Sequence, residues 1–253
     1  MYSEKFYIKN KASAQSSAEE LTKLVYKILR PMSVVDVGCA TGVFLKEFKK
    51  RGVKEILGVD SIQMNTDLLE IPKTSFIGHD LRKPLRMKRR FDLVVSLETA
   101  EHIESECANT LIDTIVKLGD IILFSAAIPY QGGTHHVNEQ WQSYWAEKFA
   151  KRGYVPVNFL RSIIWTNEKV SPDYRQNILL YVKKGRLHGG LLKLYNGTKD
   201  IPLDVAHPLY YIQNADPMFY VRHMDTRKNY TLLMKGIYYM PLHVMRNLFK
   251  KMK

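Results

Sequence analysis

The chain has 253 residues, of which 45% are hydrophobic and 25% charged, a composition typical of globular proteins that bury a full core. Its two cysteines, Cys39 and Cys107, are too few for a disulfide framework, so we expect a reducing compartment. No leader-like apolar run follows the first residues, and no stretch approaches the roughly 18 apolar residues of a membrane span. We therefore expect a cytoplasmic protein.

The net charge of +13 is unevenly distributed along the chain. Residues 183–253 carry 13 Lys and Arg against only four acids, whereas residues 1–182 are nearly balanced. A basic region on a balanced body indicates contact with an anionic surface through that region, or simply a solvated tail.

In the first half of the chain, short apolar runs alternate with helical patterns. An amphipathic helix is expected over 13–30, where Pro31 ends it. Strands are expected at 33–37, 55–59, 74–77, 91–96 and 121–125. Helices are expected at about 42–51 and 105–118. This alternation predicts a parallel sheet covered on both faces.

The pattern changes in the second half. A helix over 140–152 precedes two further strands, at 155–160 and 177–182, which a loop over 161–176 would join in an antiparallel edge. From residue 184 onward, short segments are broken by glycines and prolines. We therefore divide the chain into a helical lead (1–30), an α/β domain (31–183) and a basic C-terminal appendage (184–253).

A glycine-bearing turn follows the first expected strand. Residues 34–42 read Val-Val-Asp-Val-Gly-Cys-Ala-Thr-Gly, and such a turn between a strand and a helix lets the backbone approach a ligand. Dinucleotide binding would favour glycine at 38, 40 and 43, but these positions hold Gly, Ala and Val. At the end of the next strand, Asp60 is placed to bind two ribose hydroxyls.

Together these residues resemble the class I S-adenosylmethionine (SAM)-dependent methyltransferases over roughly residues 30–183. The resemblance implies a seven-stranded, doubly wound Rossmann-like sheet with an antiparallel edge strand, and SAM as cofactor, with S-adenosylhomocysteine as product. It implies that the 38–42 loop holds the methionine part of SAM, Asp60 the ribose and Asp80 the adenine amino group. The implied cofactor-binding residues are Asp36, Gly38, Cys39, Ala40, Gly42, Asp60, Ser61, Asp80, Leu81, Leu97 and Glu98. Asp36 and Asp80 could instead be ordinary turn and loop carboxylates.

The atom that receives the methyl group is less clearly indicated. The Asn/Asp-Pro-Pro-Tyr sequence of amino-methylating nucleic-acid enzymes is absent after the fourth strand, and no Pro-Cys nucleophile is present. An oxygen acceptor needs only alignment and a base, and histidine suits the base.

Residues 125–141, with Tyr144-Trp145 and residues 174–177, resemble a bacterial branch of this superfamily found beside glycan genes. Here His136 is the candidate base, followed by His135, Glu101 and His102. His136 and Asn138 could instead cap the following helix, and Glu101 could be a first-turn acid that favours the helix dipole. The candidate acceptor-binding residues are Tyr130, Gln131, Asn138, Trp141 and Tyr144. A metal site from Glu98, His102 and His135 has no spaced ligand motif behind it, so we expect no metal.

The sequence therefore predicts methyl transfer from SAM to a hydroxyl, in a nucleotide sugar, a lipid-linked glycan or a surface polysaccharide. The basic C-terminus, Lys250 to Lys253 beside Leu242, Val244, Met245, Leu248 and Phe249, would then face carrier phosphates or the inner membrane surface. Two alternatives stay open: an RNA ribose methyltransferase, with nucleic acid the less favoured partner, and a SAM-binding scaffold without catalysis.

Overall fold

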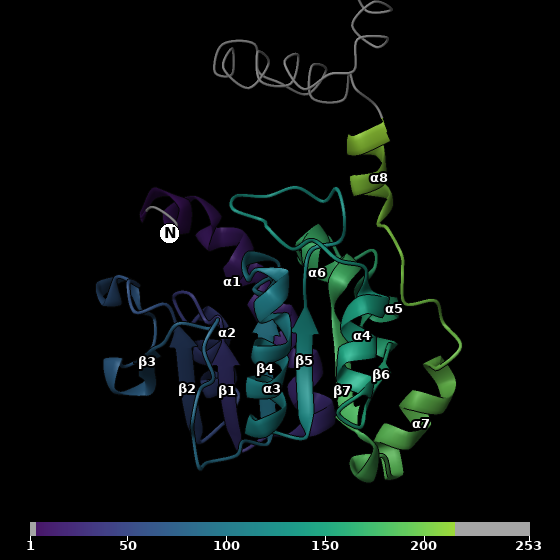
Figure 1. Ribbon diagram of the computed structural model, residues 1–253, viewed down its shortest axis with the longest axis horizontal. Coiled ribbons are helices and arrows are strands. Elements are labelled where there is room, and N and C mark those ends of the chain that lie inside the picture. Colours follow the sequence, from purple (N-terminus) through teal and green to yellow (C-terminus); the bar gives the residue numbers. More distant parts are fainter. Residues whose placement is uncertain (1–3, 216–253) are drawn as a thin grey trace, which may run out of the picture. The chain divides into compact units, whose positions relative to one another are not determined.

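The structure, a computed structural model, describes residues 4–215 (Figure 1). Its contacts divide the chain into two compact units, residues 1–207 and residues 208–253. The first unit contains a sheet of seven strands in the order β3-β2-β1-β4-β5-β7-β6. The strands are β1 (Ser33–Val37), β2 (Glu55–Asp60), β3 (Phe76–Gly78), β4 (Leu93–Leu97), β5 (Ile121–Ser125), β6 (Tyr154–Val157) and β7 (Leu179–Lys183). The predicted seven-stranded fold is confirmed.

Helices cover both faces of this sheet (Figure 1). The helices of the first unit are α1 (Glu4–Leu29), α2 (Val43–Lys50), α3 (Ala108–Leu118), α4 (Gln142–Ala150), α5 (Phe159–Ile164), α6 (Pro172–Asn177) and α7 (Gly189–Thr198). The described part of the second unit is one helix, α8 (Pro208–Ala215).

The antiparallel edge has a defined order. Strands β1 to β5 pair in parallel, and β7 then pairs antiparallel with both β5 and β6, with Ile122 opposite Tyr181 and Val157 opposite Leu180. The antiparallel strand β7 is thus second from the edge, and β6 forms the edge itself.

Two apolar layers sandwich the sheet, because successive strand residues point to opposite faces. Val34 packs with Leu21 of α1 and Phe48 of α2 on one face. Val35 packs with Ile112 of α3 and other residues on the opposite face. Strands β1, β4 and β5 are therefore buried on both sides, and the carboxyl ends of the parallel strands share one edge of the sheet.

We predicted that residues 161–176 form a loop, but they are largely helical. Helix α5 begins at Phe159 and runs into this segment, and α6 occupies its end. Helix α5 forms because Leu160 and Ile164 are both fully buried against the core. Helix α6 starts at Pro172, a residue that suits the first turn of a helix.

The chain after β7 returns to the sheet domain. The Arg161 guanidinium donates to the carbonyl oxygens of Pro202 and Leu203, and the backbone N–H of His207 donates to Gln176 Oε1 at 2.7 Å. Residues 184–207 therefore belong to the first compact unit. The basic segment 242–253, with its predicted membrane contact, lies outside the described residues.

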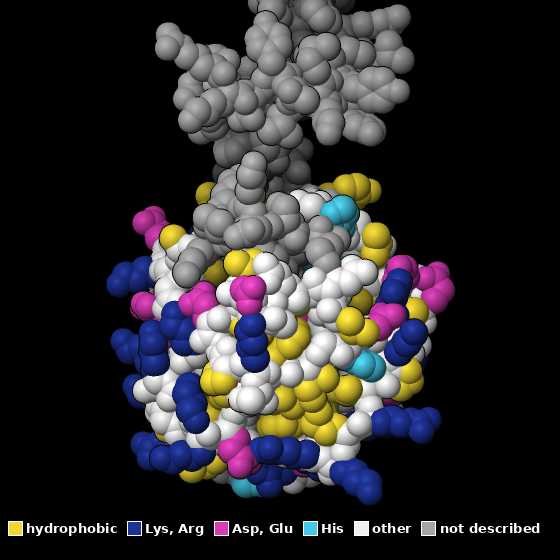
Figure 2. Space-filling model, turned by 90° about the vertical axis from the view of Figure 1, so that its left-hand side faces the viewer, with side chains coloured by type: hydrophobic (Ala, Val, Ile, Leu, Met, Phe, Trp, Pro, Cys, Tyr) yellow, Lys and Arg dark blue, Asp and Glu magenta, His cyan; other side chains and the backbone are white. Residues whose placement is uncertain are grey.

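The surface of the described chain mixes charges of both signs. On the face shown in Figure 2, Lys and Arg side chains lie around the rim with acidic side chains among them, and an apolar area lies between them. None of the helices within residues 4–215 has the length and apolar character needed to cross a bilayer.

Candidate active site

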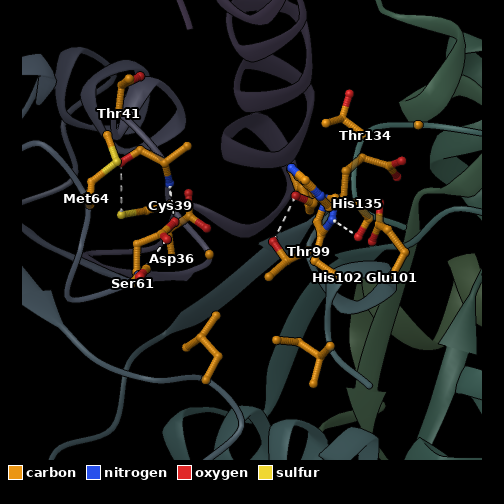
Figure 3. Close-up of a pocket in the computed structure, with 18 of the residues that line it drawn as sticks. Asp36, Cys39, Thr41, Ser61, Met64, Thr99, Glu101, His102, Thr134 and His135 are labelled. Atoms are coloured by element: carbon orange, nitrogen blue, oxygen red, sulfur yellow. Dashed lines mark hydrogen bonds between the residues drawn. The ribbon is translucent and has the colours of Figure 1, made fainter. Parts of the chain in front are cut away.

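A cavity of about 950 Å³ opens at the carboxyl ends of the parallel strands. Most of its wall is made by the segments that follow the five parallel strands β1 to β5, where open α/β sheets bind their ligands. In Figure 3, Asp36, Cys39, Ser61 and Met64 lie on one side of this cavity. Glu101, His102 and His135 lie together on the other side. We call these the β1/β2 end and the histidine end.

The backbone of the glycine loop requires its glycines. Gly38 has φ of 89°, in the left-handed region, and a Cβ there would lie 2.1 Å from Thr99 Oγ1. Gly42 has φ of 81° and precedes α2, away from the cavity wall. Ala40 between them also has a positive φ of 47°, a backbone conformation that favours glycine. The loop is thereby held close to the ligand space.

Asp60 joins the two segments of the β1/β2 end. Its Oδ2 accepts the backbone N–H of Ala40 at 2.7 Å, and its Oδ1 accepts the N–H of Ser61 at 2.6 Å. Burial raises the pKa of Asp60. Burial, and next the charge of Asp60, raise the pKa of Asp36 well above its ordinary value. Burial likewise raises the pKa of the Cys39 thiol, which therefore stays protonated and is no nucleophile.

Asp80 lines the cavity but is already paired. Its carboxylate receives two hydrogen bonds from the Arg82 guanidinium, at 2.8 and 3.0 Å. Hydrogen bonding from Arg82 lowers the pKa of Asp80 to about 2. The neighbouring Leu81 is buried and contributes apolar wall.

Glu98 is the centre of a polar network at the end of β4. Its carboxylate accepts hydrogen bonds from the amides of Asn177, at 3.1 and 3.2 Å, and Gln131, at 3.2 Å. The Gln131 amide also donates to Asp173 at 3.2 Å. Burial, followed by the charge of Asp173, raises the pKa of Glu98 to about 7.

The histidine end contains Glu101, His102 and His136. One ligand atom of each of these side chains lies within 4.8 Å of the other two. Glu101 is 1% exposed, and neither carboxylate oxygen has a hydrogen-bond partner within the described residues. Ala127 and Glu98 are close to this carboxyl but do not reach hydrogen-bonding geometry. Burial, and then the charge of Glu98, raise the pKa of Glu101.

Both histidine rings are oriented by neighbouring groups. His136 Nδ1 lies 2.9 Å from Glu139 Oε1, and His102 Nδ1 lies 3.1 Å from the carbonyl oxygen of His135. The two rings meet edge to face, with centroids 4.9 Å apart. Burial lowers the pKa of His102. Glu139 also accepts the backbone N–H groups of Tyr130 and Gly132, so it fixes the loop and the ring together.

The predicted acceptor-binding residues fall at different places. Gln131 lines the cavity, as do the candidate bases Glu101, His102, His135 and His136. Tyr130 and Trp141 are exposed outside the cavity wall, at 85% and 40%. Tyr144 lies on α4 instead, packed edge to face on Trp145 with Lys148 over its ring. Asn138 is buried, and its N–H donates to the Glu101 carbonyl, so it holds the loop in place.

Several wall residues did not emerge from the sequence. Thr99, Met64, Asp173 and Tyr174 line the cavity, and Glu139 supports it. A helix-start signal, Ser171-Pro172-Asp173, could have located α6 and its wall residues. No local signal pairs Glu139 with His136 beyond their spacing of three.

Comparison with known proteins identifies the fold family. A family described as methyltransferase domain matches residues 10–164, more than half of the chain. The chain belongs to this methyltransferase family. No curated protein sequence matches it. With the family shown, SAM is the cofactor, and the cradle of Gly38, Ala40 and Asp60 fits it, since all three residues line the cavity and the loop bends so closely past Thr99 that position 38 has no room for a side chain.

Solved methyltransferase structures share this fold at low sequence identity. The sugar N-methyltransferase of a Streptoalloteichus species is 13% identical, with a TM-score of 0.56 over 70% of this chain and 91% of that one. The SAM-bound amino pentose methyltransferase of Micromonospora echinaspora is 12% identical, with a TM-score of 0.54 over 72% and 98%. The magnesium protoporphyrin IX methyltransferase of Synechocystis, with bound S-adenosylhomocysteine, is 17% identical, with a TM-score of 0.51 over 68% and 84%.

Proposed function

We propose that this SAM-dependent methyltransferase transfers its methyl group to a hydroxyl of an uncharged sugar or glycan end. One observation carries the proposal: a single cavity joins the cofactor cradle to a polar end whose side chains are acids, amides and histidines. At about 950 Å³, the cavity is near the upper end of the range of single-ligand sites, which leaves room for an acceptor beside SAM.

The β1/β2 end would hold the cofactor. Bound SAM supplies an electrophilic methyl group on a sulfonium. The backbone of the Gly38 loop and the carboxylates of Asp36 and Asp60 would bind and orient it. Because the sulfonium needs little activation, alignment of the acceptor would provide most of the rate enhancement.

The charge of the wall indicates what kind of acceptor fits. Within the described part of the chain, eight acids line the cavity against one arginine, Arg82, which is itself paired with Asp80. The acids are Asp36, Asp60, Glu70, Asp80, Glu98, Glu101, Glu104 and Asp173. A polyanion would be repelled here, whereas hydroxyl groups can donate to carboxylates and amides. An uncharged sugar portion therefore suits the cavity better than a phosphate-rich one.

Proton removal would fall to the histidine end, where His136 is the best-placed base. Its Nδ1 contact with Glu139 fixes the ring and leaves Nε2 as the nitrogen with a lone pair when Nδ1 is protonated. A base oriented by a carboxylate is a common catalytic arrangement. His102 and His135 are next to it at the same end.

The acidic wall counts against the RNA ribose alternative. Ribose methylation within RNA would bring phosphates next to these carboxylates, and the face seen in Figure 2 mixes both charge signs. An amino sugar is the second candidate, because a protonated amine would be attracted to the same wall. Two of the similar structures are a sugar N-methyltransferase and an amino pentose methyltransferase.

We further infer a cytoplasmic enzyme whose basic C-terminus meets an anionic membrane or carrier. The charge of residues 183–253 supports this inference.

The experiment is methyl transfer from labelled SAM to three acceptor sets: neutral sugar donors and glycans, amino sugars, and RNA. NMR of the product distinguishes an O-methyl from an N-methyl group. Transfer to a neutral sugar oxygen supports the proposal, and transfer only to an amine favours the second candidate. Exclusive transfer to RNA contradicts both. Tight SAM binding with no transfer to any set or cell extract favours the scaffold alternative.

A further inference from the structure

We propose that Glu101, His102 and His136 form a binding site for a divalent transition-metal ion at the histidine end of the cavity. The sequence contains no spaced ligand motif and on its own predicts no metal. The three side chains come together only through the fold: Glu101 and His102 lie in the short turn after β4, and His136 lies in the loop after β5. The proposal deepens the proposed function and rests on it for the identity of the acceptor.

The carboxylate of Glu101 indicates a missing cation. Both of its oxygens are buried and lack a hydrogen-bond partner within the described chain. A buried carboxylate without donors is strongly unfavourable, because nothing replaces the water it has lost. Among residues 4–215, no Lys or Arg lines the cavity apart from Arg82, which pairs with Asp80. A metal ion would supply the opposite charge at this point.

The histidines have the second contacts typical of metal ligands. Nδ1 of His136 contacts the Glu139 carboxylate, and Nδ1 of His102 contacts the backbone carbonyl of His135. Metal-binding histidines almost always donate their other ring N–H to a carboxylate or carbonyl, which fixes the ring and the tautomer. With Nδ1 protonated in this way, Nε2 carries the lone pair for the ion.

Gly133 packs directly against the Nε2 edge of the His136 ring, where a side chain would not fit. A Cβ at Gly133 would lie 2.3 Å from both Nε2 and Cε1 of that ring. Gly133 has φ of 159°, which L side chains rarely adopt, so an alanine there would be strained as well as crowded. The loop is thus built with no side chain at the position where it would cover the nitrogen.

The spacing and donor types limit which ion fits. Two ligand atoms at about 2.1 Å from one ion lie at most about 4.2 Å apart. The ligand atoms of these three side chains lie within 4.8 Å of one another, so they need to move together only slightly to hold an ion. Two imidazoles and one carboxylate suit Zn²⁺ and related first-row ions, whereas Mg²⁺ and Ca²⁺ prefer all-oxygen sites.

The ion would change one role in the proposed chemistry. If the Nε2 lone pair of His136 binds the cation, it cannot also accept a proton. The ion would then lower the pKa of the acceptor hydroxyl, and this effect would replace proton removal by His136. The methyl group leaves sulfur and bonds to the acceptor oxygen, S-adenosylhomocysteine leaves uncharged, and the hydroxyl proton goes to solvent. This methyl transfer needs no oxidant or reductant.

The test is metal binding by the full, tag-free chain after chelation and dialysis. Co²⁺ serves as the probe through its visible absorption, and Zn²⁺ competes for the same site. We expect one equivalent of Co²⁺ per chain, lost in Glu101→Gln, His136→Ala and Gly133→Ala. Glu139→Gln, which removes the charge behind the His136 ring and one of the two acceptor oxygens that hold the loop, should weaken binding by about 10- to 100-fold. His188→Ala, an exposed histidine outside the cavity, is the matched control and should bind normally.

Circular dichroism and SAM binding show whether each variant is folded. Absence of stoichiometric Co²⁺ or Zn²⁺ binding, or binding that Glu101→Gln and His136→Ala leave unchanged, would overturn the site. Full methyl transfer by the chelated protein would overturn the role of the ion while leaving the proposed function intact. Stoichiometric metal binding without transfer to any sugar would support the site and count against the proposed acceptor.

Discussion

Replacing Gly38 by alanine tests whether the glycine loop is shaped as described. The new methyl group meets three atoms of one side chain, Oγ1, Cγ2 and Cβ of Thr99, at 2.1, 2.3 and 2.8 Å. Gly38 also has φ of 89°, where an L residue is strained. The structure therefore predicts that Gly38→Ala lowers both the free energy of unfolding and the affinity for SAM.

The magnitude has two parts. A residue with a side chain in the left-handed region costs about 1–2 kcal/mol. Crowding of a packed site costs typically about 1–3 kcal/mol more. Gly38→Ala should thus lose about 2–5 kcal/mol of stability. A second substitution, Thr99→Ala, removes Oγ1 and Cγ2, the two closest atoms. The double variant should therefore regain most of the stability lost to crowding, and none of the stability lost to the strained backbone.

Urea unfolding of the two single variants and the double variant gives this coupling as a double-mutant cycle. Calorimetry with SAM measures the accompanying change in affinity. If Gly38→Ala unfolds and binds SAM as the original chain does, the loop does not approach Thr99. If the stability losses of Gly38→Ala and Thr99→Ala simply add in the double variant, the new methyl group does not collide with Thr99.

Four further predictions concern single side chains. Asp60→Ala leaves two backbone N–H groups without their acceptor, so SAM affinity should fall at least about tenfold by calorimetry; unchanged affinity would remove Asp60 from cofactor binding. His136→Ala should reduce turnover by about 10²- to 10⁴-fold with SAM affinity retained, and full turnover would exclude it from the chemistry. The pKa of Glu98 is raised from 4.5 to about 7, so its contribution to stability is complete below pH 4.5 and is lost as the pH rises through about 7. Urea unfolding of the chelated protein should show a loss of about 3 kcal/mol across this window, and Glu98→Gln should flatten it. Tyr154→Phe removes a hydroxyl that donates to the Gly119 carbonyl at 2.7 Å, and should cost about 1 kcal/mol of unfolding free energy; no loss would show that the bond is not stabilising.

The central strands could be predicted from sequence because each is a short apolar run bounded by polar residues. The run at 121–125 matches β5 at both ends, and 33–37 matches β1. The glycine loop and Asp60 follow directly from their positions at strand ends. These features are local, so neighbouring residues specify them.

The histidine end could be predicted only in part, because it depends on tertiary contacts. The histidines and Glu101 were candidates from their positions after strands, but their assembly into one cluster depends on the return of the loop after β5 to the Glu101 carbonyl. Tyr130 and Trp141 were candidate acceptor-binding residues, yet both are exposed and neither lines the cavity. Nothing in a local pattern reports the side to which a loop aromatic points.

The most direct test of the account uses purified protein, methyl-labelled SAM and an extract of the source cell, with label then separated into glycan, nucleotide-sugar, lipid, amine and nucleic-acid fractions. We predict label in a glycan or nucleotide-sugar fraction, dependent on Asp60 and His136. Label that is sensitive to ribonuclease, or label that persists in Asp60→Ala and His136→Ala, would contradict it.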